Sequence, residues 1–247
     1  MSVTEHVPAA WSGMSVALGA TALTWLCTAL GAALVFIVPR LHPRAFSGLL
    51  AVAAGVMLAA ATAGLLVPAW KEFATAGPYA LLFTAVGVAL GAALSLATRH
   101  LVTRAEQQLS QRPRLGGQLF AVMSLHHVPE GMAVGLAVSA ATTGDAAAMA
   151  SATLVVLAMA SHNVLEGALV SLPMRQEGAS RLRAFTFGQL SGVAEMVGAV
   201  IGAGAVVLSV TLLPWGLAVA AGAMLTVTLV DVMPAMRVYW RSGAVVP

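Results

Sequence analysis

The chain has 247 residues, of which 60% are hydrophobic and only 9% charged, and its formal net charge is +3. Soluble domains usually carry about a quarter charged residues, so this composition excludes a soluble protein and predicts a single transmembrane domain over residues 1–247. The basic excess does not indicate nucleic-acid binding, because the basic residues lie in short segments between apolar runs. The lone Cys27 excludes an internal disulfide and a cysteine-rich zinc site.

Seven apolar runs reach about 20 residues, the length that an α-helix needs to cross a bilayer. The short segments between them contain glycine, proline and charged residues, which predicts an all-α polytopic membrane protein. The longest connection, residues 99–117, is too polar to cross and is predicted to be a flexible loop or a surface helix. The predicted spans lie near residues 14–38, 46–69, 78–98, 117–141, 146–173, 184–208 and 212–236.

The basic residues are segregated between the two predicted sides of the membrane. Of the 12 basic residues, only Lys71 lies on the side of the N-terminus. Positive residues favour the cytoplasmic side, so we predict the N-terminus outside and the C-terminus in the cytoplasm. The eleven residues on the predicted cytoplasmic side are Arg40, Arg44, Arg99, Arg104, Arg112, Arg114, Arg175, Arg181, Arg183, Arg237 and Arg241.

The fourth and fifth predicted spans contain two related strings, His-His-Val-Pro-Glu-Gly at 126–131 and His-Asn-Val-Leu-Glu-Gly at 162–167. Each places a histidine and a glutamate four residues apart, on one face of a helix. A charged carboxylate at the bilayer centre costs ~2.5 kcal/mol or more, and neither span has a Lys or Arg to pair with it. A divalent cation would stabilise both carboxylates, and this ligand set suits Zn²⁺, Fe²⁺ and Mn²⁺. The two pairs are His126 with Glu130 and His162 with Glu166.

Three neighbouring polar residues have two interpretations each. Glu195, in the sixth span, is either a third ligand or a protonated carboxyl group bonded to a Ser or Thr. His127 lies about 100° round the helix from His126, so it serves either a second metal position or packing. Asn163, at the corresponding place in the second string, is either a weak oxygen ligand or the donor of an interhelical hydrogen bond.

Three further residues carry weaker signals. Met57, in the second span, offers a thioether ligand, although most membrane-buried methionines fill gaps. Pro129 leaves the Leu125 carbonyl without its helical partner and bends the helix, which either shapes a polar cavity or only affects packing. Asp231, near the predicted cytoplasmic end of the last span, either receives a departing ion or caps a helix.

The paired strings resemble the fourth and fifth helices of the ZIP (Zrt/Irt-like) metal transporters, which usually read His-Asn-x-Pro-Glu-Gly in both. Residues 55–58, 191–195 and 221–234 resemble the second, sixth and seventh helices of that family. The resemblance implies an external N-terminus and alternating access, in which a four-helix bundle that carries the ligands moves against the remaining helices.

The chain departs from the family pattern at several places. His127 replaces the usual asparagine, and Leu165 replaces the usual proline, so the fifth helix is expected to be straighter. Many relatives have an acidic residue where this chain has residues 62–65 (Thr-Ala-Gly-Leu). The family generally has eight helices, whereas this chain ends soon after the seventh. The often His-rich loop offers only His100, which argues against metal capture there.

We therefore predict a transporter, not an enzyme, that moves a divalent transition metal towards the cytoplasm. Zn²⁺ is the expected ion, with Fe²⁺, Mn²⁺ and Cd²⁺ as alternatives, and it is a substrate rather than a cofactor. The expected location is a bacterial inner membrane, with lipid as a partner and a homodimer left open. The core site comprises His126, Glu130, His162 and Glu166; His127, Asn163 and Glu195 would complete a second site, and Met57 is an additional candidate.

Two rival functions use the same residues. The main alternative is an intramembrane metal-dependent hydrolase, in which His and Glu hold a metal that activates water. The sequence has no His-Glu-x-x-His string, however, and no Ser or Cys that pairs obviously with a base. A haem protein using His126 and His162 as axial ligands would leave the carboxylates without a role.

Overall fold

The computed structural model describes residues 3–38, 42–109, 115–142, 146–209 and 211–242, and these residues form helices joined by short turns, without any strand. The all-α prediction is therefore confirmed. Two π-helical segments, η1 and η2, interrupt longer α-helices. The elements are α1 (Val3–Ile37), α2 (Pro43–Ala59), η1 (Ala60–Leu66), α3 (Val67–Ala76), α4 (Ala80–Leu109), α5 (Leu115–Ala141), α6 (Ala146–Gln176), α7 (Arg181–Ser191), α8 (Val193–Leu208), α9 (Leu212–Val227), η2 (Thr228–Val232) and α10 (Met233–Ser242).

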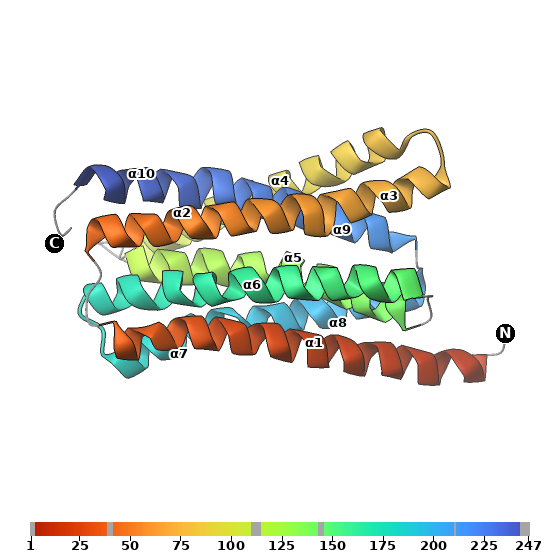
Figure 1. The fold of residues 1–247 in the computed structure, drawn as a ribbon, viewed down its shortest axis with the longest axis horizontal. Coiled ribbons are helices and arrows are strands. Elements are labelled where there is room, and N and C mark those ends of the chain that lie inside the picture. Colours follow the sequence, from red (N-terminus) through yellow and green to blue (C-terminus); the bar gives the residue numbers. More distant parts are fainter. Residues whose placement is uncertain (1–2, 39–41, 110–114, 143–145, 210, 243–247) are drawn as a thin grey trace.

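These elements form seven rods that run along the long axis of the molecule (Figure 1). The second rod is α2–η1–α3, the sixth is α7–α8 and the seventh is α9–η2–α10. Consequently, α1 begins at one end of the bundle and α10 finishes at the other (Figure 1). Within the described ranges, six rods are long and apolar enough to cross a membrane. The remaining one, α5, is 27 residues long, and its two histidines and one glutamate lower its hydropathy.

The structure differs from the predicted spans at several boundaries: α1 begins at Val3 instead of 14, and the second rod continues to Ala76 instead of 69. Of the two alternatives for residues 99–117, a loop or a helix, the first part is helical, because α4 continues to Leu109; residues 110–114 lie outside the described part of the chain. The last rod extends to Ser242 instead of 236. The sixth run is not one helix: Gly192 separates α7 from α8. A Cβ at Gly192 would lie 3.0 Å from the Thr28 hydroxyl, so this break coincides with close packing against α1.

The helices fall into two groups. In the first, α5 packs against α8 and α6, and α1 packs against α6 and α8. The backbones approach so closely that a Cβ on Gly131 would overlap the carbonyl oxygen of Glu195, and one on Gly167 that of Thr28. In the second group, α4 packs against α9, and α2 against α10. The two groups meet mainly where α5 contacts α9.

Polar residues that could bind metal concentrate in the first group. α5, α6 and α8 present their glutamates towards one another, while the outer faces of α1 and α4 carry exposed leucines. Exposed leucines are expected on surfaces that face lipid. The fold therefore surrounds a polar centre with apolar helices.

Candidate metal-binding site

The centre of the first helix group contains the two His-x₃-Glu pairs. On α5, His126 Nε2 lies 3.1 Å from Glu130 Oε1, as the i, i+4 spacing predicts. On α6, His162 and Glu166 have no exposed surface, and Glu130 is equally buried. The structure therefore brings together all four residues of the predicted core site.

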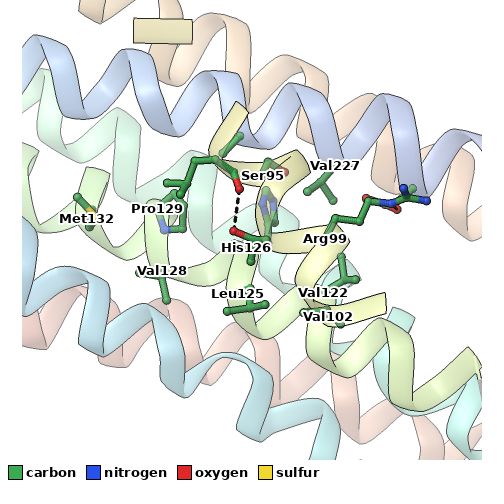
Figure 2. A pocket seen from close by; sticks show the side chains of 14 residues that line it. Ser95, Arg99, Val102, Val122, Leu125, His126, Val128, Pro129, Met132 and Val227 are labelled. Atoms are coloured by element: carbon green, nitrogen blue, oxygen red, sulfur yellow. Dashed lines mark hydrogen bonds and ion pairs between the residues drawn. The ribbon is translucent and has the colours of Figure 1, made fainter. Parts of the chain in front are cut away.

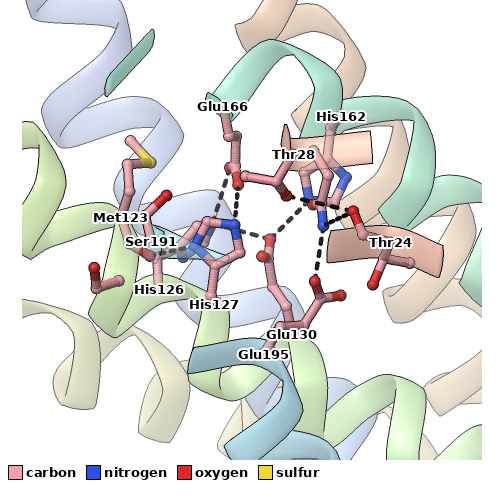
Figure 3. Close-up of polar contacts among 12 residues, drawn as sticks. Thr24, Thr28, Met123, His126, His127, Glu130, His162, Glu166, Ser191 and Glu195 are labelled. Atoms are coloured by element: carbon pink, nitrogen blue, oxygen red, sulfur yellow. Dashed lines mark hydrogen bonds and ion pairs between the residues drawn. The ribbon is translucent and has the colours of Figure 1, made fainter. Parts of the chain in front are cut away.

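The contacts between α5 and α6 cross from one pair to the other (Figure 3). Glu130 Oε1 on α5 lies 2.8 Å from His162 Nε2 on α6. In the opposite direction, Glu166 Oε1 lies 3.7 Å from His126 Nε2, and Glu166 Oε2 lies 3.1 Å from His127 Nε2. Each carboxylate thus faces an imidazole of the other helix, which a sequence spacing within one helix does not reveal.

Three of these side chains already have the spacing of a metal-ligand set. One ligand atom from each of His126, Glu130 and Glu166 lies within 4.8 Å of the other two. Zinc is bound by His nitrogen and carboxylate oxygen at about 2.0–2.2 Å, usually by four ligands, so a modest closure of these atoms around one ion would supply three of them. Two carboxylates would also compensate the charge of a divalent cation.

The imidazole rings of His127 and His162 are oriented by backbone carbonyl groups. His127 Nδ1 lies 2.6 Å from the Met123 carbonyl oxygen, and His162 Nδ1 lies 2.9 Å from that of Ala158. Because a carbonyl oxygen can only accept, both Nδ1 atoms carry hydrogen and donate it. Each ring therefore presents Nε2 to the buried cluster of histidines and glutamates at positions 126, 127, 130, 162 and 166. Metal-binding histidines characteristically donate their other N–H in this way.

The cluster also contains buried polar atoms that make no hydrogen bond among the described residues, although four of them, His126 Nε2, His127 Nε2 and both Glu166 oxygens, lie in the His–Glu contacts given above. Such atoms destabilise a protein unless they are paired. A cation coordinated by the carboxylate oxygens and imidazole nitrogens would satisfy several of them at once. Eight atoms belong to this set: His126 Nδ1 and Nε2, His127 Nε2, Glu130 Oε2, Asn163 Oδ1, Glu166 Oε1 and Oε2, and Glu195 Oε1.

Glu195 and Asn163 form an adjacent polar unit. Asn163 Nδ2 donates to Glu195 Oε2 at 2.8 Å and to the Thr24 carbonyl oxygen at 3.3 Å. Glu195 lies in the first turn of α8, where the helix dipole favours a carboxylate. The interhelical hydrogen bond considered for Asn163 is thus present, and its free Oδ1 remains available as a ligand.

Sequence reasoning missed the contribution of α1 to this unit. Thr21, Thr24 and Thr28 are fully buried, and the Thr24 hydroxyl bonds the carbonyl oxygen of Thr21 at 3.1 Å. Their hydroxyls are therefore largely satisfied within the helix, whereas the Thr24 carbonyl faces Asn163 (Figure 3). The sequence signal that could have indicated this contribution is the spacing of the three threonines, which places them on one side of an otherwise apolar helix.

Met57 and Asp231 lie apart from the cluster. Met57 is fully buried in the hydrophobic core on α2, and among the described residues it shares no polar contact with the cluster. Asp231 lies in η2, which continues directly into α10, so of its two interpretations the helix cap is not supported. Its Oδ1 instead pairs with Arg99 Nε on α4 at 2.7 Å.

A cavity of about 200 Å³ is lined by His126 of the cluster and by both members of this ion pair; Figure 2 shows His126 and Arg99 among its lining residues. Its walls come from α4, α5 and α9, so it lies at the seam between the two helix groups. His126 and Pro129 line it on the side of α5, and Arg99 and Asp231 also line it. His126 therefore borders a cavity that extends beyond the first helix group.

Comparison with known proteins gives the family. The sequence profile described as ZIP zinc transporter matches residues 103–243. Zinc transporter ZIP11 of Bos taurus is 33% identical over 92% of this chain and 91% of its own length, and its Homo sapiens counterpart is 32% identical over the same shares. Zinc transporter GufA of Myxococcus xanthus is 35% identical over 90% of this chain and 88% of its own length. The chain belongs to the ZIP zinc transporter family.

Proposed function

We propose that this protein transports Zn²⁺ through the polar centre between α5 and α6. The observation that carries the proposal is the crossed arrangement of Glu130 and Glu166, each of which faces an imidazole of the other helix. Both carboxylates are fully buried, and a divalent cation is the partner that would satisfy them together. The names of the relatives, all zinc transporters, support Zn²⁺ as the ion.

The ligands divide into two positions. His126, His162 and the two glutamates would form the first. His127, Asn163 and Glu195 would form the second, adjacent position, with the carboxylates shared between them. His127 supports this division because its Nε2 approaches Glu166 Oε2 rather than Oε1. Met57 is the weakest candidate, since only its burial in the nearby core supports a ligand role.

The cavity beside His126 offers the ion a route out of the site. Its lining includes both His126 and the Arg99–Asp231 pair, so this pair would have to separate for a cation to leave past it. The arginine-rich end of the bundle lies in the direction of this pair, and positive residues favour the cytoplasmic side. We therefore infer transport towards the cytoplasm, with the N-terminus outside, and a bacterial inner membrane as the location.

The rival functions lack comparable support. ZIP family proteins are transporters, and neither the family nor these relatives favours a hydrolase. A haem bound by His126 and His162 would need space for the iron and its ring next to both Nε2 atoms, yet Glu130 Oε1 already lies 3.1 Å and 2.8 Å from them. This geometry favours a small cation.

Uptake of radiolabelled zinc into proteoliposomes tests the proposal. We expect time-dependent accumulation that exceeds protein-free vesicles, with competition by Cd²⁺, Fe²⁺ or Mn²⁺ ranking the selectivity. Ca²⁺ and Mg²⁺ should compete poorly, because imidazole ligands favour transition metals over these ions. Accumulation no faster than in protein-free vesicles, by protein that is folded and inserted, would contradict zinc transport.

A further inference from the structure

A second hollow lies where α2 begins and α10 ends, and these two segments lie at the same end of the bundle (Figure 1). It measures about 490 Å³ and runs between these two helices. Gly48 and Ala51 of α2 form one wall, and Arg237, Trp240 and Arg241 of α10 form the other. The wall on α2 is therefore small and apolar, while the wall on α10 is basic and aromatic.

This groove is held open by contacts beneath it. The Ser47 hydroxyl on α2 donates to the Met236 carbonyl oxygen on α10 at 2.9 Å. Phe46 and Tyr239 pack edge to face, with ring centroids 4.7 Å apart. These two contacts join α2 to α10 independently of any ligand. A Cβ at Gly48 would meet no atom within 4 Å, so Gly48 leaves the hollow empty rather than permitting helix packing.

The charge in this groove is not balanced by the protein. Arg237 and Arg241 are four residues apart, so they share one face of α10, and both are exposed. Neither guanidinium forms an ion pair with a residue in the described part of the chain. Two unpaired guanidinium groups beside one hollow form a site for an anion with several oxygen acceptors, such as a phosphate diester.

The surroundings indicate that this anion belongs to a lipid. The groove lies at the end of an apolar pass that runs from Leu212 to Arg241. Val238 is 61% and Trp240 is 64% exposed beside the arginines. Exposed Trp and Arg together are typical of the membrane interface, and basic pockets between transmembrane helices bind anionic headgroups. A soluble anion would gain nothing from these apolar neighbours.

We propose that the groove between α2 and α10 binds an anionic phospholipid of the leaflet at the arginine-rich end. Arg237 and Arg241 hold the phosphate, Trp240 packs against the glycerol region, and one acyl chain lies along Gly48 and Ala51. This site is independent of the metal cluster, so it stands whether or not the protein transports zinc.

Thermal unfolding of the purified full-length protein, during titration with phosphatidylglycerol or phosphatidylcholine in a neutral detergent, tests the site. We expect phosphatidylglycerol to raise the unfolding temperature at lower concentration than phosphatidylcholine. R237Q/R241Q should need about 30-fold more phosphatidylglycerol for the same effect, as expected for two arginines at a membrane surface. R237K/R241K, which keeps the charge, should retain most of the response.

Two variants separate the groove from general charge. G48L should obstruct the α2 side of the hollow and weaken the response, while its unfolding temperature without lipid stays near that of the wild type. R104Q/R181Q removes two exposed arginines outside the groove, and its response should match the wild type. If R237Q/R241Q does not fold, the comparison of G48L with the wild type tests the proposal.

Three results would overturn the proposal. The first is an unchanged phosphatidylglycerol response in G48L or in folded R237Q/R241Q. The second is an equal response to the two lipids. The third is the same stabilisation by inorganic phosphate alone, which would assign the groove to a soluble anion.

Discussion

Glu130 on α5 and His162 on α6 are joined by a hydrogen bond of 2.8 Å between Oε1 and Nε2. His162 Nδ1 already donates to the Ala158 carbonyl oxygen, so a further hydrogen lies between Nε2 and Oε1, on one atom or the other. Both atoms are proposed metal ligands. Metal can therefore use them only after this hydrogen leaves, and zinc binding should release protons.

Zinc binding should accordingly weaken as the pH falls. An unperturbed imidazole titrates near pH ~6.5, and metal requires the deprotonated ligand. More protons compete at lower pH, so we expect affinity to fall between about pH 7.5 and about pH 5.5. Calorimetry in buffers of different ionisation enthalpy measures the protons released. An affinity that stays flat over this range, with no proton release, would mean that other groups bind the metal.

His127 should tune the second metal position without being essential for transport. It replaces the asparagine usual in the family, and its Nε2 approaches Glu166. We expect H127N to reduce zinc affinity at one of two positions by about tenfold and to keep uptake. Two-site binding isotherms measure the change. Identical isotherms for the variant and the wild type would assign His127 to packing.

The Arg99–Asp231 pair should control access to the cavity beside His126. The arginine side chain of the pair is 43% exposed, so loss of the ion pair should change the free energy of unfolding by less than about 1 kcal/mol. In a C27A background, a cysteine introduced by S95C in the cavity wall should react faster with a maleimide when R99Q is added. R104Q, which removes another exposed arginine of α4, is the control. Equal rates with and without R99Q would show that the pair does not close the cavity.

Gly131 should be required for the close packing of α5 on α8. An added Cβ would overlap the Glu195 carbonyl oxygen, so we expect G131A to destabilise the protein by about 1–3 kcal/mol, the usual cost of overpacking. G55A is the matched control, because a Cβ at Gly55 would meet no atom within 4 Å. Thermal unfolding in detergent compares the two. Equal stability of G131A and the wild type would contradict the tight α5–α8 contact.

Much of this architecture could be predicted from sequence because it depends on local spacing. Hydrophobic length gave the number of passes, and the four-residue interval placed His126 beside Glu130. The pairing of Glu130 with His162 could not be predicted, since it depends on the rotation and height of α6 against α5. The ion pair between Arg99 and Asp231 depends likewise on how α4 meets η2, 132 positions along the chain.

Backbone contributions were the hardest to predict. The Thr24 carbonyl enters the polar centre although no sequence pattern marks a carbonyl group. The break at Gly192 was missed because glycine is frequent within transmembrane helices and gives no boundary signal by itself. Met57 illustrates the opposite case, since its thioether suggested a ligand but its buried position is also that of a core residue.

The central claim is that Glu130 and Glu166 bind the transported ion. Its most direct measurement is zinc uptake by E130A and E166A in proteoliposomes at matched protein content, with E72A as the control because Glu72 is exposed on α3. We predict uptake at the level of protein-free vesicles for both site variants and wild-type uptake for E72A. Near-normal uptake by either E130A or E166A would contradict the proposed site.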